Sequence, residues 1–134
     1  MVTHSPTVAV ALAAHEGIDV EIIGGRLFRH SMVAYGATAV EAASHLRADV
    51  FLLGVTGVHA EAGLTTGDRE DAAMKRALAA RAGDTYVLAS SEKIGAASAF
   101  EVLPLDTVSG IVTDADDGPA LEALAAAGVP LIRA

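Results

Sequence analysis

The stretch ADVFLLGVTGVHAEAGLTTGDREDAAMKRAL, residues 48–78, decides the fold class. Its first part, 48–55, is short and almost continuously apolar, which is typical of a parallel strand covered on both faces. The segment 63–67 is rich in glycine and threonine, and we expect it to be a loop. A helical pattern over 69–82 follows. Strand, loop and helix in this order predict one unit of an α/β fold.

The same alternation extends along the rest of the chain. Further strands are predicted at 20–25, 84–89, 108–114 and 129–133, and further helices at 6–15, 36–46 and 118–127. Expected helix-end signals are Arg47, Gly83 and Gly128. Residues 100–106 are strand-like without a following helix, and residues 1–3 read as the tail of a strand before an N-cap at Ser5. We therefore expect a Rossmann-like, mostly parallel sheet with helices on both faces.

Composition restricts the function classes. With 134 residues, about half of them apolar, the chain can bury one core, so we expect a single domain. The absence of cysteine excludes disulfides and thiolate metal sites and fits a cytoplasmic protein. No apolar run is long enough to span a membrane. The net charge of −8, with nine scattered Lys and Arg, argues against nucleic-acid binding by this chain alone.

Polar residues cluster where the predicted strands end. In open parallel sheets, ligands bind at the carboxyl ends of the strands. The stretches at these ends are THS (3–5), GGRLFRHS (24–31), GVTGV (54–58) and SSEK (90–93). A helix beginning near Arg69 would present backbone N–H groups to a phosphate or carboxylate, and Lys75 or Lys93 would add charge.

A purely structural interpretation of the charged helix competes with the ligand site. Asp68 and Asp71 resemble a capping box, and Asp71 and Lys75 have the spacing of a helical ion pair. For this helix alone we favour the structural interpretation. Glu70 aligns with the apolar stripe of the helix, and we expect it at the edge of that stripe.

Several known signatures are absent. Arg26 occupies the position where a dinucleotide fingerprint would have its second glycine relative to Gly24. Gly54 and Gly57 form only a weak G-x-x-G pattern. The histidines lack the pairing of metal ligands, and no G-x-S-x-G elbow supports a catalytic triad. We predict neither a metal nor a cofactor.

Five motifs in order carry a family resemblance. They are GGRLFRHSMVAYG, ADVFLLGVTGVHAEAGLTT, EDAAMKRAL, VLASSEKIG and VLPLDTVSGIVTD. Together they resemble the C-terminal sensor domain of DeoR-family transcription regulators, across nearly the whole chain. The resemblance implies a fold like ribose-5-phosphate isomerase, and binding of a phosphorylated sugar or related metabolite without conversion. It also implies a homo-oligomer whose ligand alters assembly or DNA binding, in a repressor of carbohydrate metabolism genes.

The resemblance also implies effector-binding residues. These are Thr3, His4, Gly54, Gly57, Gly63, Thr65, Asp71, Lys75, Ser90 and Lys93. The chain departs from the family pattern at His4, where Asn is usual, and at Asp71, where Glu is usual. Ser90 replaces an Asp, and Glu92 replaces a Ser or Thr. These departures affect which ligand is bound.

Two family parts have no counterpart in this sequence, namely the winged helix-turn-helix and the first strand with its Ser-Gly-Ser/Thr phosphate loop. We therefore expect residues 1–134 to be a sensor domain that lacks its first β-α unit, and DNA contact to need the helix-turn-helix. One alternative is a sugar-phosphate isomerase, with Glu70 or Asp71 as base and Lys93 as electrostatic partner. Another is an assembly module that uses helices 36–46 and 118–127.

Overall fold

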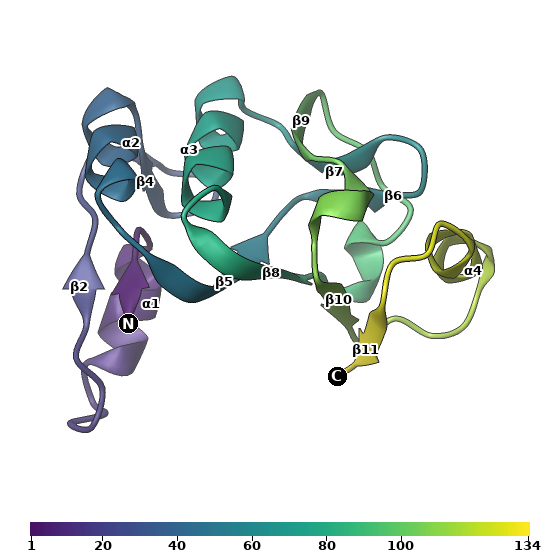
Figure 1. Ribbon diagram of the computed structural model, residues 1–134, viewed down its shortest axis with the longest axis horizontal. Helices are drawn as coiled ribbons and strands as arrows, with labels where there is room; N and C mark the ends of the chain where they lie inside the picture. The colour runs from purple at the N-terminus through teal and green to yellow at the C-terminus, as the bar shows by residue number, and fades with distance from the viewer. The chain divides into compact units, whose positions relative to one another are not determined.

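The computed structural model describes all residues from 1 to 134 and divides into two compact units, Met1–Leu46 and Arg47–Ala134 (Figure 1). Each unit contains parallel strands and helices. The α/β fold with a mostly parallel main sheet is therefore confirmed. None of the helices is long and apolar enough to cross a membrane.

The first unit pairs two short parallel strands, β1 (Val2–Thr3) and β2 (Glu21–Ile22). Helix α1 (Pro6–Leu12) joins them and begins as predicted, with Ser5 as N-cap and Pro6 in the first turn. An antiparallel hairpin follows, formed by β3 (Arg26–Phe28) and β4 (Val33–Tyr35). Helix α2 (Ala37–Ser44) completes the unit. The strand predicted over 20–25 is thus shorter than expected, and the hairpin was not predicted.

The second unit is built on a four-stranded parallel sheet in the order β11-β10-β8-β5. The strands are β5 (Ala48–Gly54), β8 (Ala82–Leu88), β10 (Gly110–Thr113) and β11 (Leu131–Arg133). Helices α3 (Arg69–Ala79) and α4 (Pro119–Ala126) lie between them in sequence. Helix α3 ends before its predicted end, so Gly83 lies in β8 rather than at a helix end. Gly128 follows α4 as predicted, with φ of 85°.

A second, antiparallel sheet corrects one prediction. It contains β6 (Gly57–His59), β7 (Gly63–Thr66) and β9 (Phe100–Leu103) in the order β6-β7-β9. Residues 63–66 of the predicted loop are therefore a strand, and all four are buried, whereas Gly67 follows the strand and is exposed. Threonine is β-branched and favours strands once neighbouring strands are available. Two short 3₁₀ helices complete the unit, Ser91–Lys93 and Leu105–Thr107.

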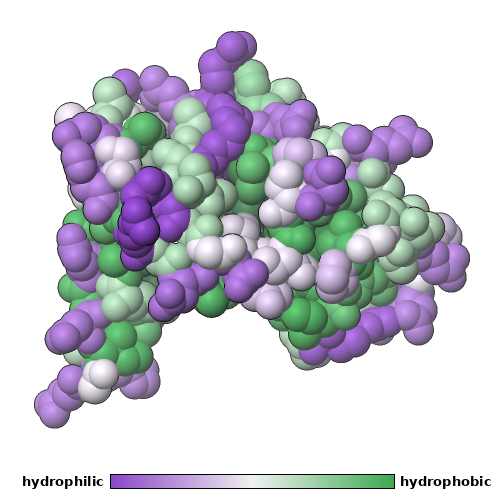
Figure 2. Space-filling view, viewed as in Figure 1, coloured by the Kyte–Doolittle hydropathy of each residue, from purple (hydrophilic) through white to green (hydrophobic).

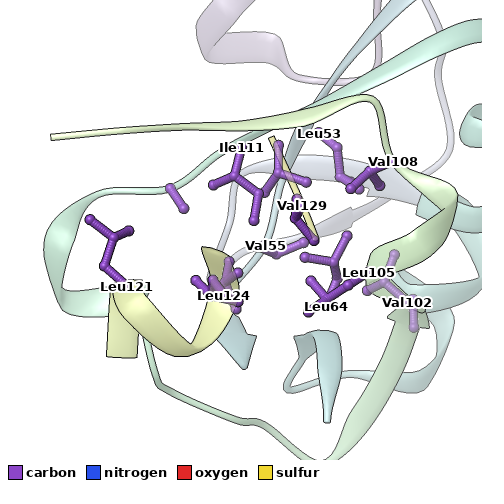
Figure 3. Close-up of a cluster of buried hydrophobic side chains, with 14 residues drawn as sticks. Leu53, Val55, Leu64, Val102, Leu105, Val108, Ile111, Leu121, Leu124 and Val129 are labelled. Atoms are coloured by element: carbon purple, nitrogen blue, oxygen red, sulfur yellow. The ribbon is translucent and has the colours of Figure 1, made fainter. Parts of the chain in front are cut away.

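One face of the parallel sheet carries the core of the second unit. Leu53, Val87 and Ile111 are fully buried there. Figure 3 labels Leu53 and Ile111 among the side chains of this cluster. Ala72 of α3 and Leu124 of α4 belong to the same cluster, together with side chains of the antiparallel sheet. Both helices of this unit therefore contribute to one apolar cluster.

The opposite face of the parallel sheet is different. Val50, Leu52 and Leu88 are 42–51% exposed, and the register places them on one face with Ile132, which is 43% exposed. Figure 2 shows hydrophobic surface near the C-terminal strand, where Figure 1 places β11. Within this unit, the expectation of helices on both faces is met on one face only.

Candidate functional site

The carboxyl ends of three parallel strands meet at one edge of the main sheet. Gly54 is paired with Leu88, and Leu88 with Val112. The residues after these strands therefore emerge side by side, as expected for a ligand-binding edge of an α/β sheet. Nothing lies within 4 Å of the position where a Cβ of Gly54 would stand, so the backbone at the end of β5 is accessible.

The turn after β8 places Ser90, Glu92 and Lys93 at this edge. The backbone N–H of Ser91 donates to Oδ1 of Asp114, which follows β10, over 2.8 Å. The Ser90 hydroxyl donates to Oε1 of Glu92 over 2.5 Å. This bond, a backbone hydrogen bond and the nearby Lys93 together lower the pKa of the Glu92 carboxyl. Lys93 is half-buried and is the only basic residue between Arg81 and Arg133.

The segment after this turn packs against the β6-β7 hairpin. Gly95 N donates to Val58 O over 2.8 Å, and Ser98 N donates to Thr65 Oγ1 over 2.8 Å. The hydroxyls of Thr56 and Ser98 are also 2.8 Å apart. The hydrogen bonds therefore join the hairpin to Gly95 and Ser98, which follow SSEK in the chain, rather than to residues 90–93 themselves.

Three residues predicted to bind the effector, Gly57, Gly63 and Thr65, instead make contacts within the protein. A Cβ on Gly57 would stand 2.5 Å from the carbonyl oxygen of Ala96, so this glycine permits close backbone packing. Gly63 has φ of 74° at the start of β7, a conformation that favours glycine. Thr65 is 3% exposed and its hydroxyl already accepts from Ser98. These three residues are packed inside the second unit, whereas Gly54, Ser90 and Lys93 lie at the carboxyl edge of its parallel sheet.

The N-terminus of α3 is capped by its own sequence. Oδ1 of Asp68 accepts from the backbone N–H groups of Glu70 and Asp71, each over 2.9 Å. These N–H groups therefore already have a hydrogen-bond acceptor, and the Asp68 carboxylate disfavours binding of an anion at this helix N-terminus. Asp71 does not reach back to complete the predicted capping box. Glu70 is exposed, as expected for the edge of the stripe.

Asp71 instead turns inward and forms a buried polar cluster between β7 and α3. Its Oδ2 accepts from Thr66 Oγ1 over 2.7 Å and from Lys75 Nζ over 2.6 Å. The side chains of Lys75 and Asp71 are 7% and 0% exposed. The predicted ion pair is therefore present, but it lies in the interior rather than on the surface. Asp71 Oδ1 is buried without a hydrogen-bond partner.

Thr3 and His4 belong to the first unit, where they lie at the end of β1. Thr3 Oγ1 accepts from the backbone N–H of Ser5 over 3.1 Å. The carbonyl oxygen of His4 accepts from Ala34 N over 2.7 Å, which ties the end of β1 to the β3-β4 hairpin. No group of three His or carboxylate side chains is placed to hold a metal ion.

A hollow of about 400 Å³ lies at the amino ends of β5 and β8, away from the predicted residues. Its lining residues are Arg47, Ala48, Asp49, Ala80, Arg81, Ala82 and Gly83. The arginines favour an anion, but Asp49 and the C-terminal end of α3 carry the opposite charge or partial charge. The hollow lies at the amino ends of the strands, whereas ligands of open parallel sheets bind at the carboxyl ends.

Sequence reasoning missed Thr56, Thr66, Ser98 and Asp114. Asp114 was available as the last residue of the predicted strand 108–114, since a carboxylate at a strand's carboxyl end meets the same criterion as SSEK. The roles of Thr56 and Ser98 depend on a contact between segments 42 residues apart, which no local pattern reveals.

The family model of the DeoR C-terminal sensor domain matches residues 1–115. The chain belongs to this family. Since these are sensor domains, the isomerase alternative receives no support.

Curated relatives are named as transcription regulators. The chain is 31% identical to the HTH-type transcriptional repressor GlcR of Bacillus subtilis over 85% of this chain and 44% of that protein. It is 29% identical to the HTH-type transcriptional regulator GlpR of Haloferax volcanii over 98% of this chain and 51% of that protein. It is also 29% identical to a putative aga operon transcriptional repressor of Escherichia coli O157:H7, over 97% and 49% respectively. The sensor-domain chain thus spans about half the length of these relatives.

Proposed function

We propose that this DeoR-type sensor domain binds a phosphorylated sugar or a related metabolite at the carboxyl edge of its parallel sheet. The observation that carries the proposal is that β5, β8 and β10 end side by side at that edge, in a domain of a sensor family. Gly54 is the last residue of β5, and Ser90 and Lys93 follow β8. Ser90 and the open backbone at Gly54 suit sugar hydroxyls, and Lys93 suits the anionic group.

The names of the relatives support a proposal for the wider role. We propose that ligand binding controls a repressor of carbohydrate metabolism genes, which contacts DNA through a helix-turn-helix rather than through these residues. Such a regulator acts in the cytoplasm, where its operator lies. The proposal includes homo-oligomerisation, because ligand-dependent assembly is one way to alter repressor affinity for a two-fold operator.

The effector-binding residues of the second unit divide into contacts and supports. Gly54, Ser90 and Lys93 would touch the ligand. Gly57, Gly63 and Thr65 would hold the edge in shape from behind, and Asp71 and Lys75 would fix α3 against β7. For Thr3 and His4, which belong to the first unit, the family resemblance alone supports a role in ligand binding.

Lys93→Ala tests the proposal most directly. Isothermal titration with ribose 5-phosphate and a panel of other sugar phosphates is expected to show binding by the wild type. The variant should bind at least tenfold more weakly, about 1.4 kcal/mol, because the edge loses its fixed positive charge. Its melting temperature should hardly change, since surface substitutions usually stay within about ±0.5 kcal/mol.

Arg47→Ala is the matched control, because Arg47 is a basic residue at the amino end of the same sheet. This variant should bind like the wild type. Equal losses in both variants would indicate general electrostatic attraction instead of a site. No binding of any sugar phosphate by the wild type, in a protein that includes the DNA-binding part, would overturn the proposed ligand class.

A further inference from the structure

The β3-β4 hairpin of the first unit combines positive charge with exposed apolar side chains. Arg26 and Arg29 are exposed, and Leu27 and Met32 are 42% and 38% exposed. No Asp or Glu occurs between Glu21 and Glu41. The hairpin is therefore positively charged, although the whole chain has a net charge of −8.

Hydrogen bonds connect the hairpin to His4 and Ser5, which follow β1. Met32 has φ of 51°, a left-handed conformation that costs free energy for a residue with a side chain. Its carbonyl oxygen accepts from the Ser5 hydroxyl over 3.2 Å, and Ala34 N donates to His4 O over 2.7 Å. These bonds fix the connection between the two strands. A surface that is already ordered loses less conformational entropy when it binds a partner.

The residue types of the hairpin are those of a protein interface. The Arg26 guanidinium lies 5.9 Å from the centre of the Tyr35 ring, and the Phe28 and Tyr35 rings are 5.6 Å apart. Neither Arg26 nor Arg29 takes part in any of the three ion pairs of the chain. Arginine, methionine and aromatic residues are enriched in interfaces, whereas lysine and carboxylates are depleted.

The positive charge of the hairpin complements the negative charge of the rest of the chain. Residues 26–35 hold two of the nine basic side chains and none of the seventeen acidic ones. The remaining residues thus hold seven basic and seventeen acidic side chains, a formal charge of −10. Two arginines are few for a polyanion, whose binding depends on many phosphate contacts. Exposed leucine and methionine favour a protein surface instead.

We propose that the β3-β4 hairpin is the surface through which two copies of this chain associate, each hairpin resting on acidic surface of the other copy. Contact between the two hairpins themselves would bring like charges together, so the two-fold arrangement places each hairpin away from its counterpart. The proposal names the surface for the self-association that forms part of the proposed function.

Molar mass by light scattering tests this proposal on the chain and its variants. The wild type should change from 13.5 kDa to twice that mass as its concentration rises. Leu27→Asp and Arg29→Glu should each raise the dissociation constant at least tenfold. Val10→Asp is the matched control, because Val10 is 76% exposed on α1 of the same unit. Added salt should weaken the wild-type dimer, because exposed charges are screened.

The possible outcomes distinguish self-association of the chain from the role of the hairpin as its surface. A wild type that stays monomeric at all concentrations overturns self-association and the hairpin surface together. A dimer that survives both hairpin substitutions overturns only the hairpin surface. A monomer that binds heparin through Arg29 would show that the hairpin serves a polyanion instead. Circular dichroism of both hairpin variants, each altered at an exposed position, should match that of the wild type.

Discussion

The carboxyl edge of the parallel sheet and the cluster between β7 and α3 contain similar residue types in opposite environments. At the edge, Ser90, Glu92 and Lys93 lie on a turn, and Lys93 is in no ion pair. In the cluster, Asp71 and Lys75 are buried and bonded to each other. Substitution at the edge should therefore change binding with little effect on stability, whereas substitution in the cluster should change stability.

Lys75→Ala should cause the largest loss of stability. It leaves Asp71 as a buried carboxylate with only the Thr66 hydroxyl as partner, and breaking a buried pair costs about 3–5 kcal/mol. Urea unfolding of wild type and variant measures this difference. The double variant Asp71→Leu, Lys75→Met should recover much of the loss, because it removes both buried charges. A loss below about 1 kcal/mol would mean that water reaches the pair and that the contrast with the edge is wrong.

Gly57→Ala should cause the next largest loss. The added Cβ would stand 2.5 Å from Ala96 O and 2.7 Å from Thr65 Oγ1, so the contact between β6 and the 94–98 segment must open. Overpacking of this kind costs about 1–3 kcal/mol. Gly54→Ala is the control at the open edge, where nothing lies within 4 Å. Thermal unfolding should separate the two variants; similar melting temperatures would place Gly57 in open space as well.

The parallel strands could be predicted because each is a local, nearly continuous apolar run. Strand β7 could not, because glycine and threonine read locally as a loop. Its strand conformation comes from pairing with β6 and β9, and β9 follows in the chain only after α3 and β8. The β3-β4 hairpin was missed for a similar reason. Its connection depends on Met32 in a left-handed conformation, held by Ser5 from another part of the chain.

In the candidate site, too, some features could be predicted from local sequence and others depend on contacts between distant segments. The rule that ligands bind at strand ends correctly identified which segments of the second unit meet, because that depends only on strand direction. It did not identify which side chains turn inward. The spacing of Asp71 and Lys75 correctly predicted an ion pair, but spacing within a helix says nothing about which face of the helix another strand covers.

Asp68→Ala should cause a smaller loss, because it removes the N-cap of α3 and frees the N–H groups of Glu70 and Asp71. Loss of an N-cap side chain typically costs about 1 kcal/mol. Asp68→Asn keeps an acceptor and should lose less. Chemical denaturation of the three proteins tests this order. If Asp68→Ala unfolds like the wild type, the cap does not stabilise α3.

The smallest expected effect concerns Glu92, at the open edge. Its pKa is lowered below the usual 4.5, mainly because the Ser90 hydroxyl donates to the carboxylate. A lowered pKa in the folded state means that the ionised group stabilises the fold at pH values above 4.5, and that this contribution is lost as the pH falls through the folded-state pKa. Glu92→Gln keeps the shape but removes the charge. The melting temperature of the wild type should therefore exceed that of the variant slightly at neutral pH, and the two melting temperatures should converge as the pH falls below 4.5.

In a protein that already carries Ser90→Ala, the substitution Glu92→Gln should have a smaller effect, because the main donor to the carboxylate is gone. A difference that persists unchanged in acid would mean that Glu92 acts through its shape and not through its charge.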